Sequence, residues 1–294
     1  MGDETHRAAT EAYLTTHRKS ISSVSPILYG VSDDGELSIT PSAAGTKSSA
    51  RDWAKQTLQA KLGLRVVPII YADDSHNPIG LQKLRKLAAN PTPFATSLVS
   101  EARHFGWSEY NIDLEECHMD ARHLKDCKNQ STTDADSQLF MELMDFLGTA
   151  LHREGITMSV DVDSRVHRQP NPDRFFKYEM FNQSKADVWV QMDTYSCYFL
   201  GFMNGLMLAR NQVNTSKLAF GLCPGCCGDD YDATELRLMF DSFALSGVNR
   251  LALWNLDDNQ HGGGSGKAGW PPALLDYLAR FLAGNEQDVG QRKA

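Results

Sequence analysis

The sequence predicts an α/β fold, a TIM (β/α)8-type barrel whose first strand is missing or non-standard. Short apolar, β-branched stretches alternate with longer segments of helical period. Seven strand–helix units follow one another, which favours a barrel, with its eight units, over a doubly wound sheet. No linker or shift in composition divides the chain. We therefore expect one domain over 1–294, with its core at about 20–285.

The expected elements follow the two hydrophobic periods along the chain. Strands are predicted at 22–31, 64–72, 109–115, 157–163, 187–195, 217–222 and 250–256. Helices are predicted at 4–19, 48–62, 79–105, 134–154, 171–185, 200–213, 234–246 and 271–283. In the 134–154 segment, Phe140, Leu143, Met144, Leu147 and Leu151 fall on one face, as in a helix packed on a core.

The composition excludes several classes of protein. Of the 294 residues, 41% are hydrophobic and 22% charged, which is typical of a globular domain. The net charge of −8 and the lack of a basic tract argue against a nucleic-acid partner. The apolar run at 64–72 is far shorter than the roughly 20 residues that span a bilayer, so no membrane partner is expected. We expect a monomer.

No cofactor or metal is expected either. The glycine-rich segment 262–267 has the wrong spacing for a phosphate-binding loop. His118 and His123 follow a predicted strand but have no partner at another strand end, so a metal-dependent barrel enzyme is a weak alternative. Cys223-Pro-Gly-Cys-Cys227 lacks the second pair of ligands that a zinc site needs.

The strongest candidate for chemistry is the predicted strand at 109–115. Alternation directs one set of side chains towards the helices and another into the barrel. The inward set is Glu109, Asn111, Asp113 and Glu115. Two close, buried carboxylates do not both ionise easily, so the pKa of one rises and that group can donate a proton near neutral pH. The alternative is that an inward Arg or Lys neutralises them, but no strand supplies one near its carboxyl end.

Three further strand ends carry candidate site residues, and each of these could instead have a structural role. Ser159, Asp161 and Asp163 share one face and either extend the acidic cluster or cap the following loop. Gln191, Asp193 and Tyr195 are in phase, and Tyr195 either donates a hydrogen bond to a substrate oxygen or packs at the rim. Trp254 lies above Ala252 and is either an apolar floor for a sugar ring or a core residue.

These residues resemble a known family. Gly-x-Ser-x-x-Asn-x-Asp-x-Glu at 106–115 resembles the fourth-strand signature of family-18 glycoside hydrolases, the chitinase family, usually D-x-x-D-x-D-x-E. Residues 25–37 resemble that family's second strand and hairpin, and 251–258 resemble its final strand. The branch most similar to this chain is the compact one around di-N-acetylchitobiase and spore-cortex hydrolases, in which Asn can replace the second Asp.

The resemblance implies a glycosidase that cleaves β-linked N-acetylglucosamine-containing glycans with retention of configuration. Glu115 matches the general acid/base, and Asp113 matches the residue that orients the acetamido group, whose oxygen is the nucleophile. Tyr195 resembles the sixth-strand Tyr with a shift in register, because the family pattern would place Thr194 there. The implied substrate-binding residues are Asn111, Trp254, Gln191, Asp193, Asp161 and Tyr29.

A second hypothesis is a non-catalytic, chitinase-like carbohydrate-binding protein. Ser108 replaces the outermost Asp of the signature, which favours this alternative. The presence of Glu115 argues against it, since such proteins usually lose the acid.

The N-terminus and the cysteines give conflicting indications of the cellular compartment. Six cysteines, compatible with three disulfides, and sequons at Asn129, Asn182 and Asn214 suggest a secreted or lysosomal/vacuolar glycoprotein. The segment before the helix at 4–19 has no apolar core of a signal peptide. Relatives begin with an apolar strand there. We therefore expect either a truncated gene product or an open barrel whose gap another segment fills.

Overall fold

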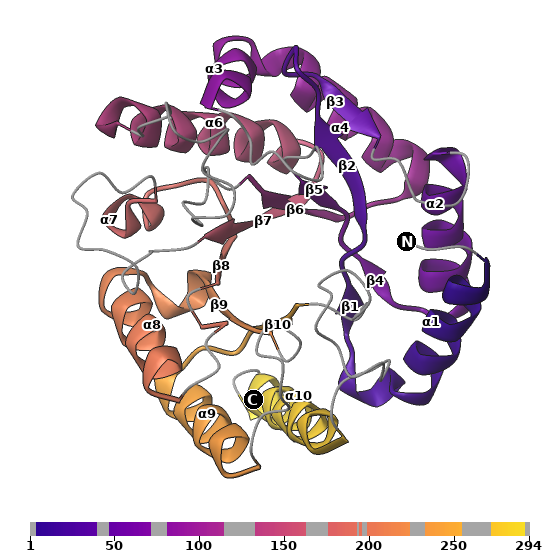
Figure 1. Cartoon of the computed structure of the whole chain (residues 1–294), viewed down its shortest axis with the longest axis vertical. Helices are drawn as coiled ribbons and strands as arrows, with labels where there is room; N and C mark the ends of the chain where they lie inside the picture. The colour runs from indigo at the N-terminus through magenta and orange to yellow at the C-terminus, as the bar shows by residue number, and fades with distance from the viewer. Residues whose placement is uncertain are drawn as a thin grey trace, which may run out of the picture. The chain divides into compact units, whose positions relative to one another are not determined.

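The computed structural model describes residues 4–39, 47–71, 81–114, 133–162, 176–192, 194–195, 199–223, 233–254 and 272–291 (Figure 1). Contacts divide the chain into two compact units. The first unit comprises Met1–Glu11, Ser23–Val162 and Pro170–Trp189, and the second comprises Ala12–Ser22, Asp163–Gln169 and Val190–Ala294. Helix α1 (Glu4–Thr16) and strand β8 (Val188–Gln191) each contribute residues to both units.

The strands of the first unit form a sheet and a short separate pair. Within the sheet the order is β7-β6-β5-β2-β3, all parallel except for the antiparallel hairpin of β2 and β3. The separate pair is β1 beside β4, also parallel. The bounds are β1 Ser23–Val24, β2 Ile27–Val31, β3 Leu37–Ile39, β4 Arg65–Val66, β5 Ile69–Tyr71, β6 Glu109–Asp113 and β7 Thr157–Val162.

Proline interrupts two strands that the sequence predicts as continuous. The predicted strand 22–31 is divided into β1 and β2 around Pro26, and 64–72 is divided into β4 and β5 around Pro68. A proline has no N–H to donate to the ladder, but its carbonyl still accepts. Pro26 O accepts from Ile69 N at 2.9 Å, and Pro68 O accepts from Asn111 N at 3.0 Å. Each proline therefore breaks the strand without separating it from its neighbour.

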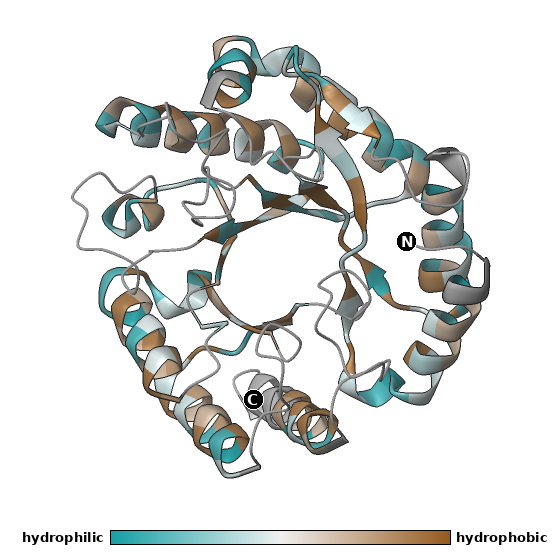
Figure 2. Cartoon of the chain, in the orientation of Figure 1, coloured by the Kyte–Doolittle hydropathy of each residue, from teal (hydrophilic) through white to brown (hydrophobic). Residues whose placement is uncertain are grey.

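Helix α6 of the first unit begins where the sequence supplies a cap. Thr133 and Asp136 form a capping box at the start of α6, and the apolar face predicted for this helix is buried. In Figure 2, brown and teal alternate along α6, as they do in an amphipathic helix. The bounds are α2 Lys47–Trp53, the π-helical η2 Ala54–Lys61, α3 Leu81–Ala89, α4 Pro91–Phe105, α6 Asp134–His152 and α7 Tyr178–Phe181.

The predicted helix 79–105 is two helices, α3 and α4. Pro91 opens α4, a position where the missing N–H costs nothing, and Asn90 precedes it in a non-helical conformation. Helix α4 ends at Gly106, whose φ of 80° is the left-handed conformation that glycine adopts without strain. Within the described residues, the predicted helix 171–185 is reduced to the single turn of α7.

The second unit packs aromatic side chains between its strands and helices. Phe243 on α9 lies 5.0 Å from Phe202 on α8 and 5.5 Å from Phe220 on β9, measured between ring centroids. Strands β9 and β10 pair in parallel. The bounds are the 3-10 helix η1 Arg18–Ser20, α8 Phe199–Gln212, the 3-10 helix η3 Thr215–Lys217, β9 Leu218–Leu222, α9 Ala233–Ser246, β10 Leu251–Leu253 and α10 Pro272–Gln291.

The N-terminal segment is helical. Residues 4–16 form α1 and 18–20 form η1, and none of the described residues before Ser23 lies in a strand. The helix predicted at 4–19 is therefore present as α1 and η1. No helix among the described residues is both long and apolar enough to span a membrane.

Candidate active site

A row of polar side chains lies on the face of strands β6 and β7 that points away from the helices. The orientation follows from Tyr110, whose hydroxyl donates to Leu98 O of α4 at 2.9 Å. Because side chains alternate along a strand, Asn111 and Asp113 lie on the opposite face. Asn111 is level with Ser159 in the parallel register. The predicted inward phase of both strands is confirmed.

Asn111 joins the two strands through its amide. Its Nδ2 donates to Ser159 Oγ at 3.2 Å and to Asp161 Oδ1 at 3.0 Å. Its Oδ1 is buried and accepts no hydrogen bond from any residue that the structure describes. Because a buried polar atom without a partner costs free energy, this oxygen is suited to accept from a ligand hydroxyl or N–H.

The carboxylates of this row are almost completely enclosed. Asp113 is 2% exposed and Asp161 is 6% exposed. Removing a carboxylate from water is costly unless other groups hydrogen-bond to it, and Asn111 supplies such a bond to Asp161. Asn111 thus contacts Asp161 directly, and Asp113 lies two residues further along the same face of β6.

Glu115 and Asp193 lie outside the described residues, and so does Asp163. Asp113 is the last residue of β6, and the chain is described as far as Leu114. Glu115 is thus two residues beyond the carboxyl end of this strand in sequence. Its role as the acid stays a prediction.

Tyr29 lies in a different layer from the polar row. Its side chain is fully buried, and its hydroxyl donates to Glu101 Oε2 of α4 at 2.8 Å and accepts from Trp107 Nε1 at 3.1 Å. Arg51 forms an ion pair with the same carboxylate. Burial, followed by the charge of Glu101, raises the pKa of Tyr29. The predicted substrate-binding role does not fit this position, because the hydroxyl serves the packing of α4 on the sheet.

The end of β8 differs from its prediction. The predicted strand 187–195 ends at Gln191, and a turn follows in which Tyr195 N donates to Met192 O at 2.9 Å. Gln191 and Thr194 are fully buried. The single hydroxyl hydrogen of Thr194 is shared between two carbonyl oxygens, with Oγ1 lying 2.8 Å from Gln191 O and 2.7 Å from Gly221 O. Tyr195 is thus placed by a turn and not by strand alternation, and its ring lies against Gly221 of β9.

Trp254 lies directly after β10 in the second unit. Its backbone N–H donates to Leu222 O at 2.9 Å, which continues the ladder between β9 and β10. Ala252 is level with Gly221 in this register, so Trp254, two residues further on, shares its face. The indole is half-buried. Trp254 and the small residue Ala252 thus share one face, as the sequence predicts. The role of the indole in binding a sugar stays a prediction.

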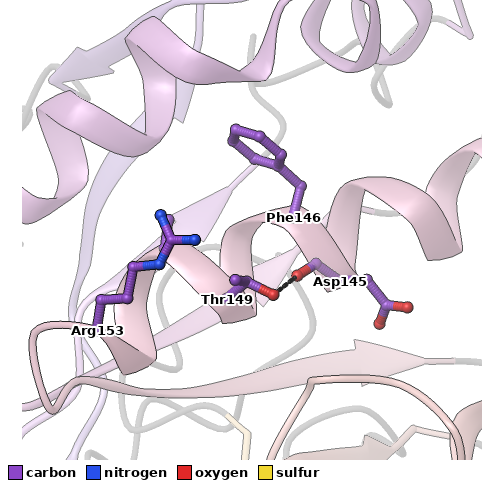
Figure 3. A pocket seen from close by; sticks show the side chains of 5 residues that line it. Asp145, Phe146, Thr149 and Arg153 are labelled. Atoms are coloured by element: carbon purple, nitrogen blue, oxygen red, sulfur yellow. Dashed lines mark hydrogen bonds between the residues drawn. The ribbon is translucent and has the colours of Figure 1, made fainter.

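The clearest pockets among the described residues lie elsewhere. One lies along α6 and its C-cap and is lined by Asp145, Phe146, Thr149, Ala150 and Arg153 (Figure 3); Thr149 Oγ1 donates to Asp145 O within the helix. Phe146 is 40% exposed there. This pocket occupies the outer side of α6, whereas the apolar side of that helix is buried. No group of three metal-ligating side chains occurs in the described parts of the chain.

Cys223 is the one cysteine among the described residues. It follows β9, is buried, and is disulfide-bonded. Its partner and the pairing of the other cysteines lie outside the described residues.

Sequence comparisons find no match, whereas structural comparisons find proteins of similar fold. No family model matches the chain, and no curated protein matches it by sequence. A chitinase from Chromobacterium violaceum superposes with a TM-score of 0.68 at 14% identity, covering 92% of this chain and 95% of that one. The spore cortex-lytic enzyme SleL of Bacillus megaterium superposes with a TM-score of 0.65 at 14% identity, covering 92% and 70%.

A third similar structure contains a carbohydrate. Catalytic domain 2 of the group II chitinase of Ostrinia furnacalis, in complex with penta-N-acetylchitooctaose, (NAG)5, has a TM-score of 0.66 at 13% identity, covering 90% of each chain. Identities this low establish the fold alone. The predicted fold class is confirmed: the chain has the α/β fold of parallel strands and covering helices found in chitinase barrel domains.

The signals that the sequence prediction missed are Gly221 and Thr194. A glycine within a buried strand often marks a close approach of another group to the backbone, and Gly221 is such a case. The sequence marks Thr194 only as the position at which the family pattern has its tyrosine. The contact of its hydroxyl with Gly221 O depends on β9, which is distant in sequence.

Proposed function

We propose that this protein is a glycoside hydrolase that cleaves β-linked N-acetylglucosamine-containing glycans by a retaining, substrate-assisted mechanism. The observation that carries the proposal is the buried row Asn111, Asp113 and Asp161 at the carboxyl ends of β6 and β7. Strand carboxyl ends are where enzymes of this fold place catalytic groups. Buried carboxylates reduce stability, and such groups concentrate at functional sites. The fold shared with chitinases supports the same reaction class.

In this mechanism Glu115 gives its proton to the glycosidic oxygen as the bond to the anomeric carbon breaks. The oxygen of the substrate's own acetamido group attacks that carbon, and a cyclic oxazolinium ion forms. Asp113 orients the acetamido group and stabilises the positive charge. Water then attacks the same carbon, gives its proton to Glu115 and opens the ring, so configuration is retained.

The remaining residues recognise the sugar. Asn111 presents an acceptor oxygen, and the ring of Trp254 stacks on the apolar face of a pyranose. Tyr195 donates its hydroxyl hydrogen to a substrate oxygen. Gln191, Asp193 and Asp161 complete the proposed set, which needs no cofactor.

The test is release of a fluorophore from N-acetylglucosamine and chitobiose glycosides. Glu115→Gln should lower kcat by about 10²–10⁴-fold, because the amide keeps the shape of the side chain and removes its proton. The matched control is Glu109→Gln at the first position of β6, where Glu109 pairs with Arg65 at 2.9 Å. That control should keep wild-type turnover. Near wild-type turnover of Glu115→Gln would contradict the proposal.

The second candidate is a non-catalytic carbohydrate-binding protein. Ser108 stands where the family signature has its outermost carboxylate, which favours this candidate. Calorimetry distinguishes the two, because a binding protein would bind chitooligosaccharides without releasing product, and Glu115→Gln would leave its affinity unchanged.

We also propose that the protein is a monomer that passes through an oxidising, secretory compartment. Buried, disulfide-bonded Cys223 supports this, as disulfides persist in such compartments. Asn182 and Asn214 are exposed, as glycan acceptors must be. Mass spectrometry of protein from secreting cells, before and after deglycosylation, tests the glycans.

A further inference from the structure

Gly221 of β9 lies unusually close to an aromatic ring. A Cβ built on Gly221 would lie 2.1 Å from Cε1 of Tyr195 and 2.9 Å from both Cδ1 and Cζ. Carbon atoms that are not bonded approach to about 3.5–4.0 Å at their optimum. The ring of Tyr195 therefore occupies the space that any side chain at position 221 would fill.

The same glycine also holds the turn that carries Tyr195. Thr194, which has no exposed surface, shares its single hydroxyl hydrogen between Gly221 O, 2.7 Å from Oγ1, and Gln191 O, 2.8 Å from it. Tyr195 N donates to Met192 O and closes the turn. Gly221 thus contacts this turn twice, through its carbonyl to Thr194 and through its bare Cα to the ring of Tyr195.

The position of the ring follows from the two faces of β9. Phe220 packs against Phe243 of α9, so Gly221 lies on the face opposite the helices. Its neighbour on β10 is the small residue Ala252. Tyr195 is only half-buried, so the phenol is not enclosed as the ring of Tyr29 is. The ring of Tyr195 therefore lies against Gly221, on the face of β9 that points away from the helices.

We propose that Gly221 is a positioning residue for Tyr195. Because Gly221 has no side chain, the ring of Tyr195 can lie against its backbone. This contact, called the seat below, sets where the phenolic hydroxyl meets an oxygen of the bound amino sugar. The seat itself follows from the geometry, whereas its effect on turnover rests on the proposed function. Thr194 is the second fixed point, because its hydroxyl ties the turn to the same residue. The sugar oxygen is a hydroxyl or acetamido oxygen, since the phenol donates one hydrogen bond.

The first experiment tests the seat without reference to activity. The chain contains nine tyrosines, and labelling with 3-fluorotyrosine gives fluorine NMR signals that Tyr195→Phe assigns by the loss of one. Gly221→Ala should shift the Tyr195 signal. The matched control is Gly148→Ala in α6, where a Cβ would lie 2.8 Å from Lys185 Cβ and O. That control crowds a buried glycine in the first unit and should leave the signal unchanged. An unshifted signal in folded Gly221→Ala would overturn the proposal.

The second experiment is a double-mutant cycle on turnover. Gly221→Ala should lower kcat by about 10- to 100-fold, since small displacements of positioned groups have effects of this size. The KM should change much less. In the Tyr195→Phe background, Gly221→Ala should cause no further loss, because the group it positions is already absent. Losses that multiply in the double variant would show that Gly221 acts by packing alone and would overturn the positioning role.

Failure of the proposed function can be told apart from failure of this inference. If the wild type binds chitooligosaccharides without hydrolysing them, the same cycle is measured on Kd by calorimetry, and the same non-additivity is expected. If it neither binds nor hydrolyses them, the proposed function fails, and the fluorine signal of Tyr195 in Gly221→Ala alone decides whether the seat exists.

Discussion

The strand faces that point away from the helices differ sharply between the two units. In the first unit, β6 and β7 present buried polar side chains, among them Asn111, Asp113 and Asp161. In the second unit, β9 and β10 present small residues, Gly221 and Ala252, with aromatic rings over or beside them. Both faces are built by the same alternation along parallel strands.

The two faces are suited to different functions. Buried carboxylates cost stability and can change protonation or orient a charged intermediate. Aromatic rings on small residues add apolar surface that can bind a sugar ring without any charge. We therefore expect substitution of the carboxylates on the first face to lower turnover most, and substitution of Trp254 on the second face to weaken affinity. The predictions below run from the largest expected effect to the smallest.

Asp113→Asn should lower kcat by about 10²–10⁴-fold with little change in fold, since the two side chains have nearly the same shape. The amide cannot stabilise an oxazolinium ion as a carboxylate does. A thiazoline analogue of N-acetylglucosamine, which mimics that ion, should bind the wild type far more tightly than the sugar does. Calorimetry measures both, and equal affinities in the wild type would exclude a substrate-assisted mechanism.

Trp254→Ala should weaken oligosaccharide binding by about 2 kcal/mol, close to a thirtyfold rise in Kd. The control is Trp107→Phe, because Trp107 is buried and stacks on Phe105 at 5.4 Å in the first unit. That variant should lose stability and keep its affinity. The same outcome for Trp254→Ala would make its indole a core residue.

Asp136→Asn should lower the free energy of unfolding by about 1–2 kcal/mol at pH 7 without changing kcat. Arg85 donates to both oxygens of Asp136, at 2.8 and 2.9 Å, and holds its pKa below the usual value, as does Thr133. We place the effect in the lower part of the range because Arg85 is half-exposed and its charge is screened.

The pH dependence of that difference has a definite sign. A lowered pKa in the folded state stabilises the fold above the unfolded value of about 3.9, and this contribution is lost as the pH falls through the folded value. Urea unfolding of wild type and Asp136→Asn should therefore show a constant gap from pH 7 to about 5 that shrinks below about 4. A gap that stays constant down to pH 2 would rule out the ion pair as its source.

Tyr29→Phe should have the smallest effect, about 1 kcal/mol of stability and no change in oligosaccharide affinity. It removes the hydroxyl shared by Glu101 and Trp107 in the helix-facing layer. Tyr195→Phe is its counterpart on the open face and should lower turnover instead. If Tyr29→Phe weakened sugar binding, Tyr29 would have to be counted among the substrate-binding residues, as the sequence predicts.

The strands that lie in the sheet core were predictable because their signals are local. The alternation of β6 places Tyr110 against α4 and Asn111 against Ser159, as its hydrogen bonds show. Tyr29 had no such signal, since Leu28 and Gly30 on either side of it are also buried and the period of two is lost. Only the hydrogen bond to Glu101 of α4, far along the chain, shows where its hydroxyl lies.

The sequence by itself determined the repeat of strands and helices, the capping of α6, and the polar face of β6 and β7, because each depends on residues within a few positions of one another. The tertiary structure decided where β8 ends and how Tyr195 is held. A period-two pattern carries the predicted strand through to Tyr195, but Thr194 bonds to Gly221 O, and the ring of Tyr195 needs a residue without a side chain on β9. These contacts join residues more than twenty-five positions apart, so no local sequence pattern can predict them.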